Sequence, residues 1–190
     1  EFSSFARMPK PAPESDDIAD MVREVVFLMR VGYPDIEMHN DIPDGKVIAR
    51  FDRRLLGQAV TNIVKNATES IAAVDPAVRG PGMITITLRD DKATETAIID
   101  VTDNGVGFPA ENRQRLLEPY MTTRSTGTGL GLAIVGKILE DHGGGIELLD
   151  NPAGRGARVR MRISTNAADN AADNDSAGVR LPHTGTELRQ

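Results

Sequence analysis

Residues 97–108 read AIIDVTDNGVGF, and this stretch decides the fold class because an apolar run leads directly into a glycine-containing loop. The run AIIDV is typical of a central strand that is buried on both faces. Asp103, at the end of the strand, can accept a hydrogen bond from an exocyclic amine, while Gly105 and Gly107 admit a flat ring or an unusual φ angle. Asp-Asn-Gly is also common in turns, so the motif taken alone is more typical of a plain turn.

A long helix is predicted before this strand, from a cap at Asp52 to about Ala73, because apolar residues cover about half of its circumference. Asn62 and Asn66 lie on one face of this helix beside the apolar stripe, with Glu69 one turn further. An amide oxygen suits Mg²⁺ when the ion shares its coordination shell with phosphates and water. For the pair taken alone, an ordinary solvated helix face is the more usual explanation.

Residues 127–132 read GTGLGL and open another predicted helix, which runs from about Gly129 to His142. Glycines let the backbone approach phosphates, and the N-terminus of a helix favours anions. The segment differs from the dinucleotide-binding fingerprint because MTTRST precedes it instead of a strand, and the pattern GxxxxGK[ST] is absent. Residues 104–128 show no sustained period and are predicted to form a long loop, which in a compact domain is usually functional.

The remaining segments complete one domain over residues 14–164. A helix is expected from Ser15 or Asp16 to Gly32. Residues 1–13 contain three prolines and are predicted to be a linker that follows the end of an upstream helix. Residues 165–190 contain AADN twice in tandem and are predicted to be disordered. Strands are expected at 36–40, 46–51, 83–89, 96–102, 146–149 and 157–163.

The composition narrows the classes of function. A formal net charge of −6 argues against a nucleic-acid binder, which would need a basic face. The chain has no cysteine, so disulfides and thiolate metal sites are excluded. No apolar run approaches the roughly 20 residues of a membrane span, and no signal peptide opens the chain. We therefore expect a domain that lies on the water side of any membrane.

Taken together, the order of the motifs is far more specific than each motif alone. NIVKNA on a helix, DNGVGF after a strand, EPYMTTR in a loop and GTGLGL at a helix start resemble the ATP-binding domain of sensor histidine kinases, within the wider family of gyrase B, Hsp90 and MutL. The resemblance covers about residues 15–164. EFSSFARMP and EPYMTTR are similar to the nitrogen-regulation subgroup, NtrB and NtrY. This implies an α/β sandwich of the Bergerat type, a mixed sheet of about five strands with about three helices on one face.

The resemblance also implies a site for ATP and Mg²⁺. Asn66 would hold the metal ion and Asn62 would support it or the phosphates, while Asp103 would bind the adenine amine. Phe108 to Thr126 would form the ATP lid, with Arg124 as its candidate for a contact to the terminal phosphate. Asn62 and Arg124 are the catalytic candidates. The expected nucleotide-binding residues are Asn62, Lys65, Asn66, Asp103, Gly105, Gly107, Phe108, Thr123, Arg124, Gly127, Thr128, Gly129, Leu130, Gly131 and Leu132.

Three departures from the family pattern stand out. Glu69 occupies a position where many members carry a base, so Lys65 is the alternative for that contact. Tyr120 stands in for the usual phenylalanine of the lid, or that phenylalanine is missing. Gly156-Ala157 replaces a frequent Gly-Thr, which removes a hydroxyl that could help at the adenine.

The resemblance favours a kinase over an ATPase. Gyrase B, Hsp90 and MutL place a glutamate, the general base for water, where this chain has Asn62, and an amide cannot take a proton at neutral pH. A serine kinase of the anti-sigma-factor type and a degenerate nucleotide-binding module are the alternatives. None of His39, His142 and His183 lies in the family's phosphoacceptor motif. The resemblance therefore implies two partners, a response regulator and the dimerisation domain of the full-length protein, which is expected to be a homodimer.

The ATP-binding domain is expected to be cytoplasmic, in a full-length protein that can be anchored in the bacterial inner membrane.

Overall fold

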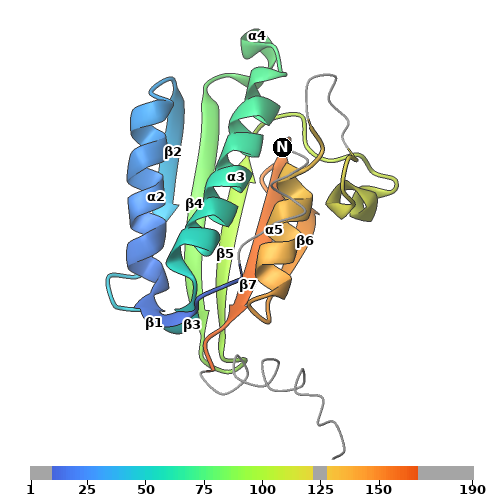
Figure 1. The fold of residues 1–190 in the computed structure, drawn as a ribbon. Helices are drawn as coiled ribbons and strands as arrows, with labels where there is room; N and C mark the ends of the chain where they lie inside the picture. Colours follow the sequence, from blue (N-terminus) through green and yellow to red (C-terminus); the bar gives the residue numbers. More distant parts are fainter. Residues whose placement is uncertain (1–9, 122–127, 167–190) are drawn as a thin grey trace, which may run out of the picture.

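The structure, a computed structural model, describes residues 10–121 and 128–166. A five-stranded mixed sheet in the order β2-β4-β5-β7-β6 carries three helices on one face (Figure 1). This two-layer arrangement confirms the predicted α/β sandwich. The helices are α2 (Ile18–Gly32), α3 (Arg53–Ala72) and α5 (Gly131–Glu140), and the strands are β2 (Ile36–Asp41), β4 (Gly82–Asp91), β5 (Thr96–Asp103), β6 (Gly145–Asp150) and β7 (Ala157–Ser164).

The central strand β5 pairs antiparallel with both β4 and β7, so it delivers Asp103 to the middle of one end of the sheet. Its residues alternate: Ala97, Ile99 and Val101 are buried, whereas Ile98 and Thr102 are half-buried. The prediction that the strand is buried on both faces is therefore confirmed on the side of the helices and in part on the other side, where Asp100 is buried and Ile98 and Thr102 are half-buried. The helices cover one face of the sheet. On the other face, arginine side chains lie over the strands and reduce their exposure to solvent.

Asp100 is the buried acid on that second face, with 2% of its surface exposed. The Arg160 guanidinium donates from Nε and Nη2 to its two carboxylate oxygens, each over 2.8 Å, and Arg89 Nη2 reaches it over 3.4 Å. A buried carboxylate is tolerated only when it is paired and hydrogen-bonded in this way. The apolar signal of AIIDV thus includes one residue whose burial depends on ion pairing.

Two short strands form a separate sheet, since β1 (Glu14–Asp17) pairs antiparallel with β3 (Ile48–Phe51). The expected helix start at Ser15 or Asp16 was wrong by two or three residues. Asp17 is the N-cap, with its carboxylate accepting from Ala19 N over 3.0 Å, and the residues before a cap are extended. The predicted strand at 46–51 exists in its second half but does not join the main sheet.

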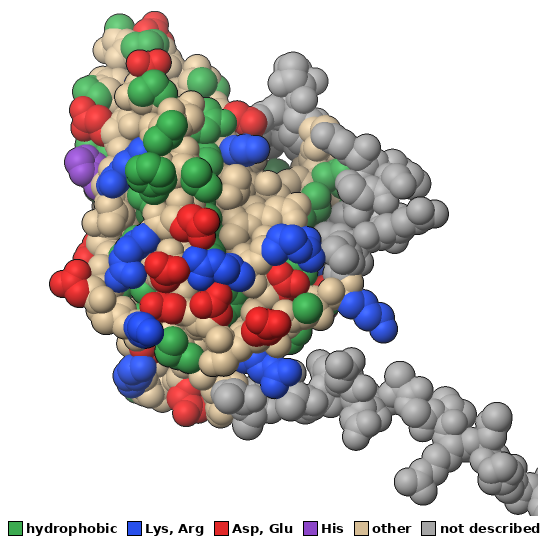
Figure 2. Space-filling model, turned by 60° about the vertical axis from the view of Figure 1, so that its left-hand side comes forward, with side chains coloured by type: hydrophobic (Ala, Val, Ile, Leu, Met, Phe, Trp, Pro, Cys, Tyr) green, Lys and Arg blue, Asp and Glu red, His purple; other side chains and the backbone are tan. Residues whose placement is uncertain are grey.

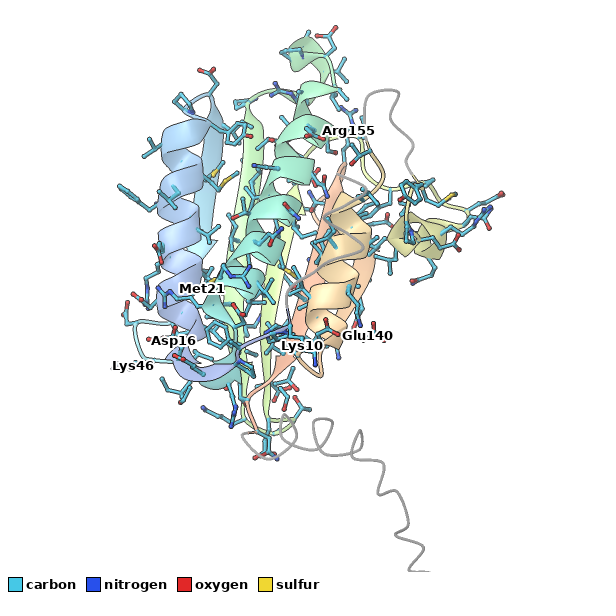
Figure 3. All side chains as sticks on the ribbon, in the orientation of Figure 1. Lys10, Asp16, Met21, Lys46, Glu140 and Arg155 are labelled. Carbon is cyan, nitrogen blue, oxygen red and sulfur yellow. The ribbon has the colours of Figure 1, made fainter. Side chains whose placement is uncertain are left out.

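The helix α3 lies between α2 and α5 in the helical layer (Figure 1). Met21 extends from α2 towards α3 (Figure 3), where its sulfur would lie 3.8 Å from a Cβ at Gly57. At the other neighbour, Nε2 of His142 accepts from Asp52 N over 2.9 Å, and its Nδ1 lies 2.6 Å from Ile138 O. The packing of Met21 at Gly57 and the bond from Asp52 to His142 both fix the N-terminal half of α3. One hydrophobic core joins all three helices to the sheet.

The outward face of α2 combines charge and apolar side chains (Figure 2). Arg53 of α3 pairs with Asp16, Asp20 and Glu24 over 2.8–3.1 Å. Phe27, Leu28 and Val31 lie near its C-terminal end, each more than half exposed. Among the described residues, no helix combines the length and apolar character that crossing a membrane requires.

Two short elements complete the described chain, α4 (Pro76–Arg79) and the 3₁₀ helix η1 (Arg113–Leu117). The helix η1 lies inside residues 104–128, which were predicted to form a long loop, and α4 lies between the predicted helix that ends at about Ala73 and the strand predicted at 83–89. Of the predicted linker, residues 10–13 show no regular structure, and residues 1–9 lie outside the described part. The predicted disordered tail falls beyond the described residues from 167 onwards.

Candidate functional site

A cavity of about 540 Å³ opens at the end of the sheet where β5 finishes. Its walls come from α3, from β5 and β7, from the loop after β5 and from the first turn of α5. Segments that are far apart in the sequence therefore meet there. The size is that of an ordinary small-molecule site.

Asp103 is the carboxylate of this cavity, with 6% of its surface exposed. Its Oδ1 accepts three hydrogen bonds: from Gly105 N over 2.8 Å, from Ser70 Oγ over 3.3 Å and from Ala157 N over 3.4 Å. The donors belong to the loop, to α3 and to β7. Because they approach from three elements, the carboxylate is held in a defined orientation.

The loop after Asp103 is fixed by further contacts. Asn104 accepts from Met83 N over 2.9 Å and donates to Pro81 O over 2.8 Å, which ties the loop to the start of β4. Asn151 donates to Asp103 O over 2.9 Å, which ties it to the turn after β6. A Cβ at Gly105 would overlap the Ser70 hydroxyl and lie 2.6 Å from the Ser70 carbonyl oxygen, so glycine is required there by space.

Asn66 lines the cavity and lies next to the start of α5. A Cβ at Gly131 would lie 3.6–3.7 Å from the two polar atoms of the Asn66 amide. The first backbone amides of a helix have no partner within the helix, so this end favours a phosphate. A neutral amide oxygen next to a phosphate site fits Mg²⁺, which takes few protein ligands and completes its shell with phosphate and water oxygens. The described residues contain no cluster of three or more His, Cys, Asp or Glu that could hold a metal ion without such help.

The described half of the predicted lid is anchored to the sheet by Arg113. Its guanidinium pairs with Asp150 over 2.6 Å, donates to Pro109 O over 3.3 Å and lies 5.7 Å from the centre of the Phe108 ring. Phe108 and Leu116 line the cavity. The first part of the loop therefore forms an apolar wall of the cavity.

Tyr120 and Gly129 bring the two sides of the loop together. Tyr120 N donates to Gly129 O over 3.0 Å, and Gly129 has φ +68°. A Cβ at Gly129 would lie 2.8 Å from the Tyr120 Cα, so both the conformation and the space require glycine.

Comparison with known families agrees with this geometry. The family described as histidine kinase-, DNA gyrase B-, and HSP90-like ATPase matches residues 51–167, which include Asn66, Asp103 and the start of α5. The chain belongs to this ATPase family. The resemblance expected from the four motifs is thereby confirmed.

Individual relatives include a nitrogen regulation protein and solved structures of a histidine kinase catalytic domain and of ShkA. The nitrogen regulation protein NtrY of Azorhizobium caulinodans is 58% identical over 163 residues, which are 86% of this chain and 21% of that protein. The catalytic domain of histidine kinase ThkA is 27% identical with a TM-score of 0.68, over 80% of this chain and 95% of that one. ShkA, solved at full length in complex with AMPPNP, is 25% identical with a TM-score of 0.65, over 85% of this chain and 33% of that one. The chain thus spans about a fifth of the length of NtrY.

The cavity of this ATPase-family domain brings together only part of the expected nucleotide-binding set. Asn62 is half-buried and Lys65 is exposed, and neither lines the cavity. Gly105 and Leu130 are buried behind its wall. Thr123, Arg124 and Gly127 lie outside the described residues. The expected residues that do line it are Asn66, Asp103, Gly107, Phe108, Thr128, Gly129, Gly131 and Leu132.

Several lining residues were not among the predicted ones. Ser70 follows Asn66 by one helical turn, so the spacing of Asn62 and Asn66, continued by one turn, could have indicated it. Leu116 and Met121 line the cavity from the predicted lid, and Val159 lines it from β7. These apolar residues give no signal in the sequence, because any core position has the same composition.

Proposed function

We propose that this chain binds Mg-ATP and transfers the γ-phosphate to a histidine in the dimerisation domain of its own full-length protein, for relay to an aspartate of a response regulator. The observation that carries the proposal is the Asp103 carboxylate, which three donors hold in a cavity that the start of α5 also lines. An amine-binding group and a phosphate-binding end are the two requirements of an adenine nucleotide. ShkA, a relative by fold, was solved in complex with AMPPNP.

The chain's own residues have distinct parts in this proposal. Asp103 accepts from the adenine amine, and the backbone at the start of α5 orients the phosphates. Asn66 would hold Mg²⁺, which supplies charge neutralisation at the phosphates when it is bound. Arg124 is proposed to stabilise charge on the terminal phosphate.

Transfer to histidine is favoured over hydrolysis by the residue at position 62. An amide cannot accept a proton at neutral pH, so Asn62 cannot act as a general base for water. Transfer to a better nucleophile requires mainly positioning and charge stabilisation. We propose that Asn62 supports the phosphates or their metal ion and takes no proton.

Neither of the two histidines that the structure describes lies in the family's phosphoacceptor motif. His142 is 3% exposed and both ring nitrogens contact backbone atoms. His39 lies on β2, 3.8 Å from Glu37. The acceptor, the homodimer contact and a membrane anchor are therefore proposed for other parts of the full-length protein, with nitrogen regulation as the process that the name of its relative NtrY suggests.

The test is a phosphotransfer assay with radiolabelled ATP. The chain is incubated alone, with the histidine-bearing hairpin of its full-length protein, and with a hairpin whose histidine is replaced by glutamine. We expect label on the intact hairpin only and slow release of phosphate throughout. Label on the isolated chain, or rapid phosphate release without the hairpin, would contradict the proposal. Nucleotide binding with no transfer in any mixture would favour a degenerate binding module.

A further inference from the structure

We propose that Ser70 is a positioning residue for adenine selectivity, acting through the Asp103 carboxylate; this inference rests on the proposed function. Ser70 lies near the C-terminal end of α3 and is 6% exposed. Its Oγ lies 3.3 Å from Asp103 Oδ1 and 3.1 Å from Val106 N. The hydroxyl therefore lies between the carboxylate and the loop that follows it.

The direction of these hydrogen bonds follows from their donors. Val106 N–H can only donate, so Ser70 Oγ accepts at that contact. A hydroxyl carries a single proton, which is then directed at the carboxylate, because a carboxylate can only accept. The result is a chain from Val106 N–H through Ser70 O–H to Asp103. Burial strengthens such a chain and makes the loss of its middle member costly.

Packing against Ser70 also restricts the loop that follows Asp103. Val106 N also lies 3.3 Å from Ser70 O, and the position of a Cβ at Gly105 is occupied by Ser70. The loop after Asp103 therefore rests directly on this residue of α3. Removal of the hydroxyl leaves the loop in place but releases one side of the carboxylate.

The other two donors to Asp103 Oδ1 are backbone amides, of Gly105 and Ala157. They keep the carboxylate near its place, whereas Ser70 approaches from a third direction. A carboxylate that rotates by a few tens of degrees makes a poorer hydrogen bond to an amine, because hydrogen bonds weaken with misalignment. The hydroxyl should therefore matter for ligands that carry the exocyclic amine and matter little for those that lack it.

The test compares two ligands that differ at the amine alone, ATP and purine riboside triphosphate, each titrated with Mg²⁺ into the 190-residue chain. We expect Ser70→Ala to weaken ATP binding by about ten-fold, the effect of one hydrogen bond to a charged group, and to change the binding of the analogue by less than about two-fold. Thr68→Ala is the matched control. Thr68 is a buried hydroxyl on the same helix that donates to Lys65 O over 2.8 Å and does not line the cavity.

Two further variants keep the test decisive. Ser70→Cys nearly preserves the size of the side chain but supplies only a weak hydrogen-bond donor. It should show the same selective loss of ATP binding, and it replaces Ser70→Ala in the test if that variant folds poorly. Asp103→Asn should abolish the effect of Ser70→Ala in the double variant, because a residue that acts through Asp103 is not additive with it. Equal weakening of both ligands, or additive effects, would overturn the positioning role and leave the proposed function intact. Failure of the wild-type chain to bind Mg-ATP would overturn both.

Discussion

The amide of Asn66 lies next to the start of α5, and the residue before it on the helix, Lys65, is exposed and outside the cavity wall. We predict that Asn66→Ala weakens Mg²⁺-dependent ATP binding by at least about ten-fold, the factor that 1.4 kcal/mol represents. Binding in the presence of EDTA should change little, because the substitution removes a metal ligand and no base contact. Lys65→Ala is the matched control and should leave both affinities near those of the wild type. Isothermal titration with and without Mg²⁺ measures all four values.

Equal loss in Mg²⁺ and in EDTA would show that Asn66 contributes to the shape of the cavity instead. A loss in Lys65→Ala as large as that in Asn66→Ala would restore Lys65 to the nucleotide contacts that the family resemblance suggested. The same titration therefore tests two of the expected residues at once.

At the scale of single residues, the sequence indicated which residues form the site better than it indicated their burial and hydrogen-bond partners. Asp103 and Asn66 line the cavity, and the family resemblance had implied both as ligands. Each pattern taken alone was more typical of a plain turn or of a solvated helix face. His142 lies just after α5 and is buried; its Nδ1 lies 2.6 Å from Ile138 O, the contact of a partner for the helix C-terminus, and its Nε2 also accepts from Asp52 N. That bond joins residues 90 positions apart, so no local pattern could indicate it.

Asp52 shows how one cap holds an element in place. Its Oδ1 accepts from Leu55 N over 3.0 Å and its Oδ2 accepts from Ala12 N over 3.1 Å, so the cap joins α3 to the segment before β1. Burial raises the pKa of Asp52, but these backbone donors and Arg54 outweigh it and hold the pKa below its ordinary value. The charged form is therefore favoured by folding.

We predict that Asp52→Ala lowers the free energy of unfolding by about 1–2 kcal/mol near pH 7, the usual effect of losing an N-cap. Asp52→Asn keeps a capping side chain and should lose less. Because the pKa of Asp52 is lowered by folding, its stabilisation is complete above the ordinary value of 3.8 and disappears as the pH falls through the folded-state pKa. The difference between the wild type and Asp52→Asn should thus narrow below about pH 4. Urea unfolding at several pH values tests this, and a difference that widens on acidification would contradict it.

At the scale of elements, periodicity placed the helices and the main strands, and the errors have local causes. The long helix was predicted from the Asp52 cap to about Ala73 and was found at Arg53–Ala72, since a cap and an apolar stripe both mark it. The helix before it starts at Ile18, because Asp17 takes the cap. Pairing of β1 with β3 was missed because it joins two short strands that are distant in the sequence and have no strong alternation.

At the scale of the whole molecule, the described residues share one hydrophobic core, and α3, the start of α5 and the sheet line the cavity. A ligand in that cavity binds only the folded chain, because the unfolded chain does not bring these elements together. Binding should therefore raise the melting temperature as the ligand concentration rises. The family relationship and the fold could be expected from the order of four motifs, but the cavity wall from the lid could not, since its apolar residues resemble any core.

We predict that Mg-ATP at a hundred-fold excess over its Kd stabilises the chain by about 2.7 kcal/mol. For a domain of this size, that corresponds to a rise in Tm of roughly 5–10 °C.

MgCl₂ alone should give almost no shift in Tm, because the described residues hold no cluster of acids that could bind the ion without phosphates. EDTA should reduce the shift that ATP produces. GTP should give a smaller shift than ATP, because guanine has a carbonyl oxygen, which can only accept, at the position of the adenine 6-amino group. Differential scanning fluorimetry over a range of ligand concentrations measures each case. A shift with MgCl₂ as large as that with Mg-ATP, or equal shifts with ATP and GTP, would mean that stabilisation comes from a site other than the one at Asp103.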